Sequence, residues 1–303
     1  MAPFRMIAVV ICLFYWTASG HCEEPAFDTA RIEALTGLKG SYQEAEDVFK
    51  VTSPRSDLPV KVDQVAMPPF MGFTSWAAFT PGKQEPLMVM GDLVLLEDEV
   101  NPVMSVALGE GLQVTALHNH FFYDVPKVYF MHIGGEGSLE QLASAVGKAM
   151  AKVKAIREAQ KEHANGFEGP GRPDKNAISS QPLEAVFEAK STAKDGMCKF
   201  VWGRKVKMEC GCEAGKEMGV NTWAAFGGTD ESAVVCGDFA VLESELQPVL
   251  KSLRGSGINI VAIHHHMVGE SPRTLFLHYW GRGKAADLAK ALKAAKNVQD
   301  RQP

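Results

Sequence analysis

The sequence predicts an α+β protein that is built as an internal tandem duplication. Three observations support this class. The same motifs occur twice in one register, strand-like and helical segments alternate inside each copy, and a segment rich in Gly, Pro and polar residues separates the copies. We therefore expect two similar layers of antiparallel sheet, each with helices packed against it.

The duplication is visible as a set of identities at one offset of 146 residues. Gly91-Asp92 recurs as Gly237-Asp238, and Pro102-Val103 recurs as Pro248-Val249. The motif Trp-Ala-Ala-Phe, which begins at Trp76, recurs from Trp223 at an offset of 147, which indicates a gain or loss of one residue. Together with the composition of the linker, these matches predict a first repeat at 26–164, a linker at 165–177 and a second repeat at 178–297.

Within the first copy, the elements are expected in the order strands, helix, strand, strand, helix. The expected early strands are 48–51, 60–65 and 74–79. The apolar run 87–97 is typical of a buried strand, and 98–108 is typical of a helix with Pro102 in its first turn. Segments 112–120 and 127–133 are expected strands, and apolar residues at helical spacing predict a long helix from 139 to about 163.

The bulk composition is that of a globular protein and excludes one class of function. The chain has 303 residues, of which 46% are hydrophobic and 22% are charged, so it can bury a substantial core. The net charge is −5 and the isoelectric point is near 6.0. Because nucleic-acid binding usually requires a strongly basic face, a nucleic-acid partner is not expected.

The amino terminus has the layout of a secretory signal peptide over residues 1–20. A short basic start precedes eleven apolar residues, and small residues follow. The run is too short to cross a bilayer, and no other segment approaches that length, so a secreted or periplasmic protein without a membrane span after cleavage is expected. In an oxidising compartment cysteines can pair, and Cys198 with Cys210 or Cys212 is the bridge that we expect.

Each copy carries a histidine pattern that is typical of a metal site. His118 and His120 are two residues apart on a predicted strand, so their side chains lie on the same face, and His132 lies on the next strand. If the two strands are antiparallel neighbours, the three imidazoles converge. Three converging imidazoles are a common way to bind a divalent transition metal, with zinc the first candidate. The matching residues of the second copy are His264, His266 and His278.

A carboxylate near the histidines would complete such a site. Glu97 and Glu243, expected at the end of the buried strand, are the candidates for the catalytic base, because burial of a carboxylate is costly without a partner. Asp92 and Asp238 are alternatives as a fourth ligand or as a hydrogen-bond acceptor. The repeated acid at Asp124 and Glu270 would correspond to the acid that follows the histidine pair in cupins, although the predicted helices argue against a pure β-barrel.

These residues leave three functions open. The first is a metal-dependent enzyme, with hydrolysis as the expected reaction. The second is a protein that binds a metal or an unknown small molecule without chemistry, and the third is a protein whose histidines form a structural hydrogen-bonded cluster. No nucleophile elbow, phosphate-binding loop or dinucleotide fingerprint is present in the sequence. The sequence therefore identifies neither the substrate nor the reaction.

The repeated motifs resemble those of the LppY/LpqO-type protein family. The resemblance depends on Gly-Asp-x-x-x-Leu-Glu at 91–97, Ala-x-His-x-His at 116–120, Phe-x-His-x-x-Gly at 130–135, and their partners in the second copy. It covers roughly residues 27–296 and implies export and duplication, but no reaction. His21 before Cys22 departs from a lipidation signal, so the resemblance does not imply attachment to a membrane.

Overall fold

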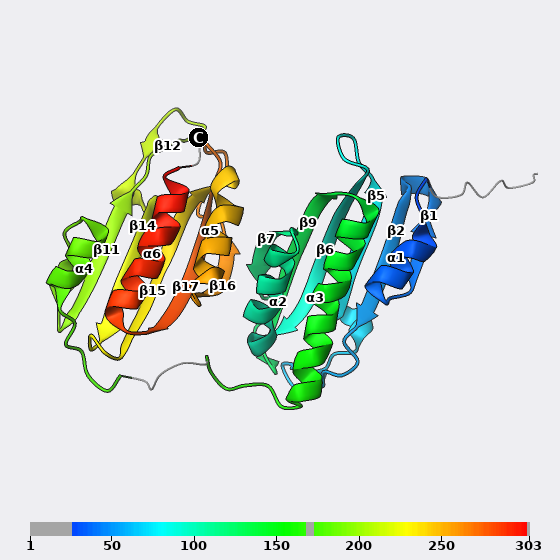
Figure 1. Cartoon of the computed structure of the whole chain (residues 1–303), viewed down its shortest axis with the longest axis horizontal. Helices are drawn as coiled ribbons and strands as arrows, with labels where there is room; N and C mark the ends of the chain where they lie inside the picture. Colours follow the sequence, from blue (N-terminus) through cyan, green and yellow to red (C-terminus); the bar gives the residue numbers. More distant parts are fainter. Residues whose placement is uncertain (1–25, 168–172, 302–303) are drawn as a thin grey trace, which may run out of the picture.

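The computed structural model describes residues 26–167 and 173–301, and this part of the chain has the mixed α+β fold of a duplicated protein (Figure 1). The main elements of the first repeat are α1 (Thr29–Thr36), β1 (Gly40–Gln43), β2 (Val48–Pro54), β5 (Thr74–Pro81), β6 (Leu87–Leu96), α2 (Glu97–Gly109), β7 (Gln113–His118), β9 (Val128–Gly137) and α3 (Leu139–Ala159). Those of the second repeat, in the same order, are α4 (Ser180–Phe187), β10 (Thr192–Lys194), β11 (Met197–Gly203), β14 (Asn221–Gly228), β15 (Ala233–Leu242), α5 (Glu243–Gly255), β16 (Asn259–His264), β17 (Thr274–Gly283) and α6 (Ala285–Gln299).

The main strands of both repeats lie in one sheet, whereas the sequence predicted two separate layers. Among the described residues, the sheet has twelve strands in the order β1-β2-β5-β6-β9-β7-β16-β17-β15-β14-β11-β10. The repeats meet edge to edge where β7 and β16 run antiparallel, through the single pair Leu117 and Ile263. These two residues occupy equivalent positions in the two repeats, so the join is locally symmetric.

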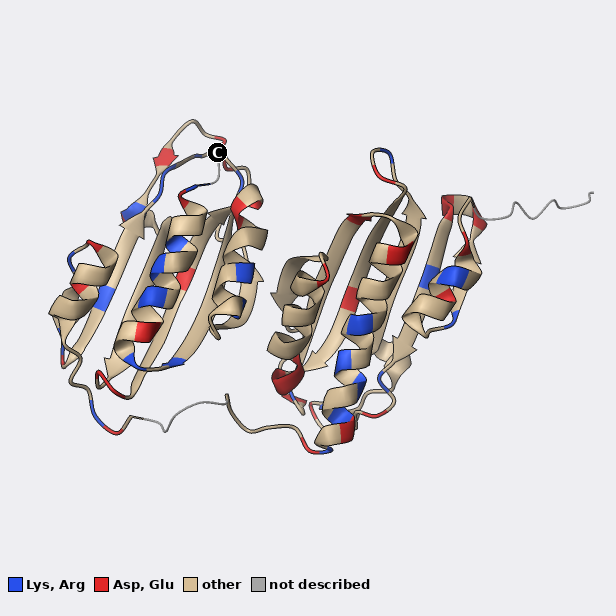
Figure 2. Ribbon diagram, viewed as in Figure 1, with Lys and Arg blue, Asp and Glu red and all other residues tan. Residues whose placement is uncertain are grey.

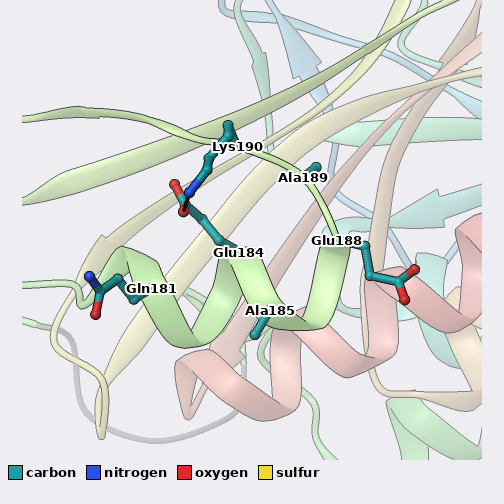
Figure 3. A pocket seen from close by; sticks show the side chains of 6 residues that line it. All are labelled: Gln181, Glu184, Ala185, Glu188, Ala189 and Lys190. Carbon is teal, nitrogen blue, oxygen red and sulfur yellow. Dashed lines mark hydrogen bonds and ion pairs between the residues drawn. The ribbon is translucent and has the colours of Figure 1, made fainter.

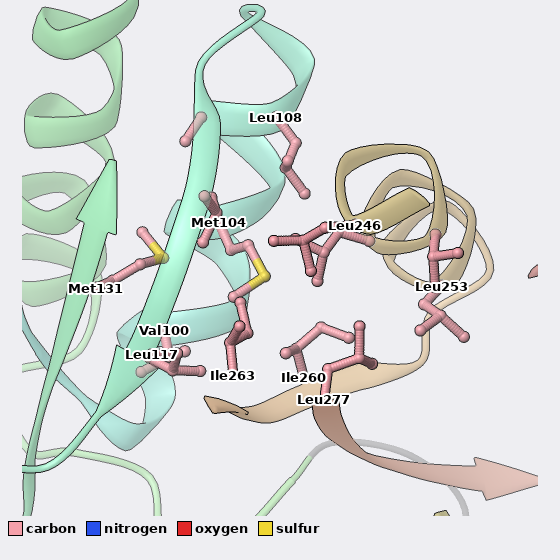
Figure 4. Close-up of a cluster of buried hydrophobic side chains, with 14 of the residues drawn as sticks. Val100, Met104, Leu108, Leu117, Met131, Leu246, Leu253, Ile260, Ile263 and Leu277 are labelled. Atoms are coloured by element: carbon pink, nitrogen blue, oxygen red, sulfur yellow. The ribbon is translucent and has the colours of Figure 1, made fainter. Parts of the chain in front are cut away.

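Two side-chain amides strengthen this join. The Asn101 side chain donates to the Ile260 carbonyl oxygen at 3.1 Å and accepts from the Ile260 N–H at 2.8 Å. The equivalent Gln247 side chain makes the same pair of bonds to Val114, at 2.9 and 3.0 Å. Beside these bonds an apolar cluster crosses the join (Figure 4), and it includes Val100, Met104, Leu108, Leu246, Leu253 and Leu277. The repeats therefore share one hydrophobic core.

The helices cover one face of the sheet and leave the other face for different contacts. Leu93 of β6 and Met131 of β9 are fully buried in the core that the helices cover. Lys and Arg residues occur along α3 and α6 (Figure 2), which is usual for helices with one face on a core and one in solvent. Because successive strand residues point to opposite faces, the neighbours of Leu93 and Met131 point away from the helices.

Three small strands cover part of the opposite face in the first repeat. The strands β3 (Lys61–Val62), β4 (Val65–Ala66) and β8 (Asp124–Val125) form a sheet of their own. A separate apolar cluster lies beneath them, and it contains Phe73, Val94 and Phe130. In the second repeat, the shorter pair β12 (Val206–Lys207) and β13 (Glu213–Ala214) accompanies a smaller cluster.

Each repeat buries an ion pair at the start of the helix that follows its central strand. Arg55 donates two hydrogen bonds to Glu99, at 2.7 and 2.9 Å, and the Glu99 carboxylate also accepts the Leu96 N–H. Arg204 and Glu245 repeat this pair at 2.5 and 2.6 Å. Burial would raise the pKa of Glu245, but the bonds from Arg204 and from the Leu242 N–H hold that pKa below its usual value.

The structure revises several sequence predictions at the ends of segments. The long helix ends at Ala159 rather than near residue 163, and the strand that carries the histidine pair ends at His118. The expected disulfide is absent, because Cys198 is a free thiol buried in the core and Cys210 and Cys212 are also free. The predicted signal peptide lies outside the described residues. Within those residues, no helix is both long and apolar enough to cross a membrane.

Candidate functional site

The candidate site of the first repeat lies on the sheet face that the helices do not cover. The strand register places Trp76, Asp92, His132 and Ala116 in one row across four neighbouring strands. Directly paired residues of antiparallel strands point to the same face. Asp92 is the chain neighbour of Leu93, and His132 is the chain neighbour of Met131, so the side chains of Asp92 and His132 point away from the helices.

The second repeat forms the equivalent row from Trp223, Asp238, His278 and Ala262. Both sites occupy the same face of the joined sheet. At the join, Leu117 and Ile263 point into the helix-side core, so the next residues, His118 and His264, point to the opposite face. The two histidine sites therefore flank the join on one surface, which the sequence alone did not establish.

In the first repeat, the three predicted histidines come together. The Nε2 atoms of His132 and His118 lie 3.1 Å apart. His120 packs parallel to Phe130 with ring centroids 3.3 Å apart, and its ring centroid lies 5.2 Å from that of His118. Partial burial and the neighbouring His118 lower the pKa of His120, while Asp92 opposes this shift.

In the second repeat, the three histidines gather around a buried carboxylate. The Nε2 atoms of His264 and His266 lie 3.2 Å apart, and Asp238 Oδ2 lies 3.5 Å from His266 Nε2 and 3.8 Å from His278 Nδ1. His266 packs against Phe276 as His120 packs against Phe130, with centroids 3.5 Å apart. One ligand atom from each of Asp238, His264 and His266 falls within 4.8 Å of the others, so this cluster could hold a metal ion.

The charge states of the second cluster are consistent with that chemistry. Burial and the neighbouring imidazoles lower the pKa of His264 to about 4, so this ring is neutral near pH 7 and has a free electron pair for a metal. Burial raises the pKa of Asp238, although His278 and His266 oppose the shift. One carboxylate oxygen of Asp238 is buried and has no hydrogen-bond partner among the described residues, and the same is true of Asp92.

Glu97 and Glu243 are not the carboxylates beside the histidines. Each is the first residue of a helix, α2 or α5, and is exposed, whereas the sequence placed it at the end of a buried strand. Burial raises the pKa of Tyr129, and the negative charge of Glu97 raises this pKa further. Tyr129 packs against the helix-side core, so Glu97 is near that side of the sheet. The buried acids of these helix starts are Glu99 and Glu245, which bind arginine. Asp92 and Asp238, the alternative acids, occupy the histidine row.

The repeated acid at positions 124 and 270 has a local structural role. Asp124 accepts the Val128 N–H at 2.8 Å, and Glu270 accepts the Thr274 N–H at 3.0 Å. Each side chain therefore fixes the turn before the strand that carries the third histidine. This assignment, together with the open sheet, removes the correspondence to the cupin acid.

A lysine and a tryptophan border each centre, and the repeat register identified only the tryptophans as equivalent residues. The ammonium group of Lys50 lies 4.3 Å from the ring centroid of Trp76, and Lys199 lies at the same distance from Trp223. The two lysines are separated by 149 residues, outside the main register, so the offset did not reveal them. Their repetition places a positive charge at the edge of each site.

Two hollows in the second repeat differ in their relation to this site. One, of about 340 Å³, lies directly beside the second centre and is lined by His278, Trp223 and Trp280 among others. The other, of about 480 Å³, runs along α4 (Figure 3). Its lining contains no histidine, and its Lys190 is bound to Glu184 at 2.9 Å. Only the first is part of the candidate site.

Comparisons with known proteins identify a family but no activity. The search of curated proteins found no match. Among solved structures, a trimeric bacterial microcompartment shell protein, PduB, is 13% identical with a TM-score of 0.22, over 86% of this chain and 89% of that chain. The double-ringed trimeric shell protein MSM0271 from the RMM microcompartment is 11% identical with a TM-score of 0.20, over 75% and 83%.

A family model matches the chain twice, over residues 30–152 and 181–298, once in each structural repeat. The two matched segments together span more than half of the chain and include both histidine sites. The chain therefore belongs to the family described as Domain of Unknown Function (DUF1259).

Proposed function

We propose that this protein binds a divalent transition metal at each of its two histidine centres, and that the metal is zinc. The observation that carries this proposal is the buried Asp238 carboxylate beside His264 and His266, because one of its oxygens has no hydrogen-bond partner within residues 26–167 and 173–301. A buried carboxylate without full hydrogen bonding is costly unless a cation compensates it. A set of imidazole and carboxylate ligands suits zinc.

The spacing of the imidazole nitrogens supports the same conclusion. Two nitrogens that bind one tetrahedral zinc at ~2.0–2.1 Å lie about 3.3 Å apart. The observed separations are 3.1 Å between His118 and His132 and 3.2 Å between His264 and His266. An N–H···N hydrogen bond would give a similar distance, so a purely structural histidine pair is the alternative that the experiment must exclude.

The test is metal content and affinity in matched variants. Purified protein should contain close to two zinc ions per chain, or take them up in calorimetric titration with zinc. His264→Ala should lose one of the two ions, and His118→Ala should lose the other. His265→Ala is the matched control, since His265 is an exposed neighbour outside the cluster. Absence of zinc binding in the folded wild-type protein would contradict the proposal and favour structural histidines.

Hydrolysis is the specific chemistry that we propose for such a centre. Asp238, His264 and His266 would hold the zinc with three ligand atoms, and such a centre would have room for water and for an unknown small-molecule substrate, with His278 half-exposed beside Asp238. An open position is typical of catalytic zinc, which activates water for attack on an ester, amide or phosphate. In this proposal, His278, whose Nδ1 lies 3.8 Å from Asp238 Oδ2, would be the base that accepts a proton from such a water.

Zinc-loaded protein should therefore hydrolyse a simple test ester such as 4-nitrophenyl acetate faster than the zinc-free protein. His278→Ala should reduce this rate while most of the zinc stays bound. A rate that does not depend on zinc would exclude this chemistry and leave a binding protein without catalysis.

We also propose that the protein is exported and that the LppY/LpqO-type proteins are its relatives within the family. The basic start and the short apolar run of residues 1–20 support cleavage by signal peptidase. Amino-terminal sequencing of the mature protein after expression in a bacterial host tests this directly. An intact Met1 on the purified protein would contradict export.

A further inference from the structure

The hollow beside the second centre has walls that the first centre lacks. Cys236 and Trp280 are paired across β15 and β17, on the same face as Asp238 and His278. The equivalent residues of the first repeat are Met90 and Gly134, which are paired across β6 and β9. A tryptophan therefore lies two residues beyond the third histidine in one repeat, and a glycine lies there in the other.

A second aromatic wall comes from the segment that connects the repeats. Phe167 stacks on Trp280 with ring centroids 6.4 Å apart and an interplanar angle of 23°. The Phe167 carbonyl oxygen accepts a hydrogen bond from Arg282 Nη1 at 3.0 Å, which holds Phe167 over β17. Together with Trp223 and His278, these rings line the open hollow of about 340 Å³.

The charges around the hollow favour an anion. Lys199 holds its ammonium group over Trp223 at the rim. With a divalent ion bound, the neutral imidazoles and the single Asp238 carboxylate leave the centre with an excess positive charge. The hollow therefore has aromatic walls and a positively charged end. Aromatic walls bind planar rings by stacking, and the charged end attracts an anionic donor that can coordinate the metal.

We infer that the second centre, and not the first, binds small anionic ligands that carry an aromatic ring, with the anionic group on the metal and the ring between Trp280 and Trp223. This inference rests on the proposed metal centres. It goes beyond them because it assigns a class of ligand and a difference between the two repeats.

The test uses two probes that share one metal-binding group, namely benzohydroxamate and acetohydroxamate. Each is titrated calorimetrically into full-length, zinc-loaded protein in which a His118→Ala or a His264→Ala substitution leaves one intact centre. The intact second centre should bind benzohydroxamate about tenfold more tightly than acetohydroxamate, since the phenyl ring is buried against the aromatic walls. The intact first centre should bind the two probes with similar affinities.

Two variants of the second centre localise the effect. Trp280→Gly reproduces the residue of the first repeat and should abolish the preference for the phenyl probe. Phe167→Ala changes a side chain that is 41% exposed, so it should leave the fold intact and weaken the preference. In both variants zinc affinity should be unchanged, because neither residue is in the Asp/His cluster.

The outcomes separate the two proposals. Protein that binds no zinc overturns the metal centres and this inference with them. Protein that binds two zinc ions but prefers neither probe at the second centre, or prefers benzohydroxamate equally at both centres, overturns only the aromatic-anion site. A preference that survives in both Trp280→Gly and Phe167→Ala also overturns it.

Discussion

The two repeats hold the same chemical groups in the same row of the sheet, but they surround them with different walls. Asp92 and Asp238 occupy equivalent positions, as do the three histidines of each repeat. Beside the first centre the equivalents of Cys236 and Trp280 are Met90 and Gly134. The shared residues show what a centre of this type requires, and the differing residues show where the two centres can differ in ligand.

The largest expected difference between the repeats concerns their buried ion pairs. Glu99 is fully buried with Arg55, whose side chain is only 5% exposed, whereas Arg204 of the second pair is 26% exposed. Glu99→Ala removes a buried carboxylate that pairs with both Arg55 and Arg157, and should lower the free energy of unfolding by about 3–5 kcal/mol. Glu245→Ala should cost about half as much, since Arg204 can reach water.

Urea denaturation followed by circular dichroism measures both effects. Glu97→Ala, at an exposed position on the same helix, is the control and should leave the unfolding midpoint nearly unchanged. If Glu99→Ala and Glu245→Ala lower the free energy of unfolding by the same amount, the solvent exposure of the arginine does not determine the loss of stability.

The carboxylates of the two centres provide the second comparison. Asp238 lies in one cluster with His264 and His266, whereas the first centre brings His118 and His132 together by their Nε2 atoms. We expect Asp238→Asn to weaken zinc binding at the second centre by about 10–100-fold, and Asp92→Asn to have a smaller effect at the first. Competition with a zinc-binding dye measures both. If Asp92→Asn weakens zinc binding more than Asp238→Asn does, the carboxylate of the first centre, and not that of the second, is the more important one for the metal.

Much of this comparison could be predicted from the sequence, because duplication fixes equivalent positions without any structure. The histidine triples and their strand periodicity predicted a shared face, and the register of β6, β7 and β9 has Asp92 in the same row. The burial of Glu97 was mispredicted because the apolar run 87–96 ends one residue earlier, and the helix begins at Glu97 itself. Periodicity locates the interior of an element better than its ends.

The joined sheet could not be predicted, because edge pairing between repeats depends on surfaces that are distant in sequence. Asn101 and Gln247 occur at equivalent positions, but they are different residue types. They therefore do not appear among the identical residues that reveal the repeat. Their role is visible only when each reaches the backbone of the opposite repeat. The aromatic walls were missed for a similar reason, since Phe167 belongs to the segment between the repeats.

Those two amides give the third prediction. Asn101→Ala leaves the N–H and carbonyl of Ile260 without their side-chain partners, and Gln247→Ala does the same to Val114. Each variant should lower the free energy of unfolding by about 1–3 kcal/mol, and by similar amounts, because the bonds are symmetric. The rate of amide hydrogen exchange at Ile260 should rise only in Asn101→Ala, and the rate at Val114 should rise only in Gln247→Ala. Unchanged exchange would show that β7 and β16 hold the join alone.

The smallest expected effect concerns the lysines that border the centres. Each ammonium group lies 4.3 Å from a tryptophan centroid, so Lys50→Met and Lys199→Met should each cost about 0.5–1 kcal/mol of stability. Only Lys199 also borders the aromatic hollow, so only Lys199→Met should weaken binding of benzohydroxamate to zinc-loaded protein. That loss should diminish at high salt, because charge attraction at an exposed rim is screened. If Lys50→Met weakens binding of this probe equally, the two rims are equivalent and the positive charge does not distinguish the repeats.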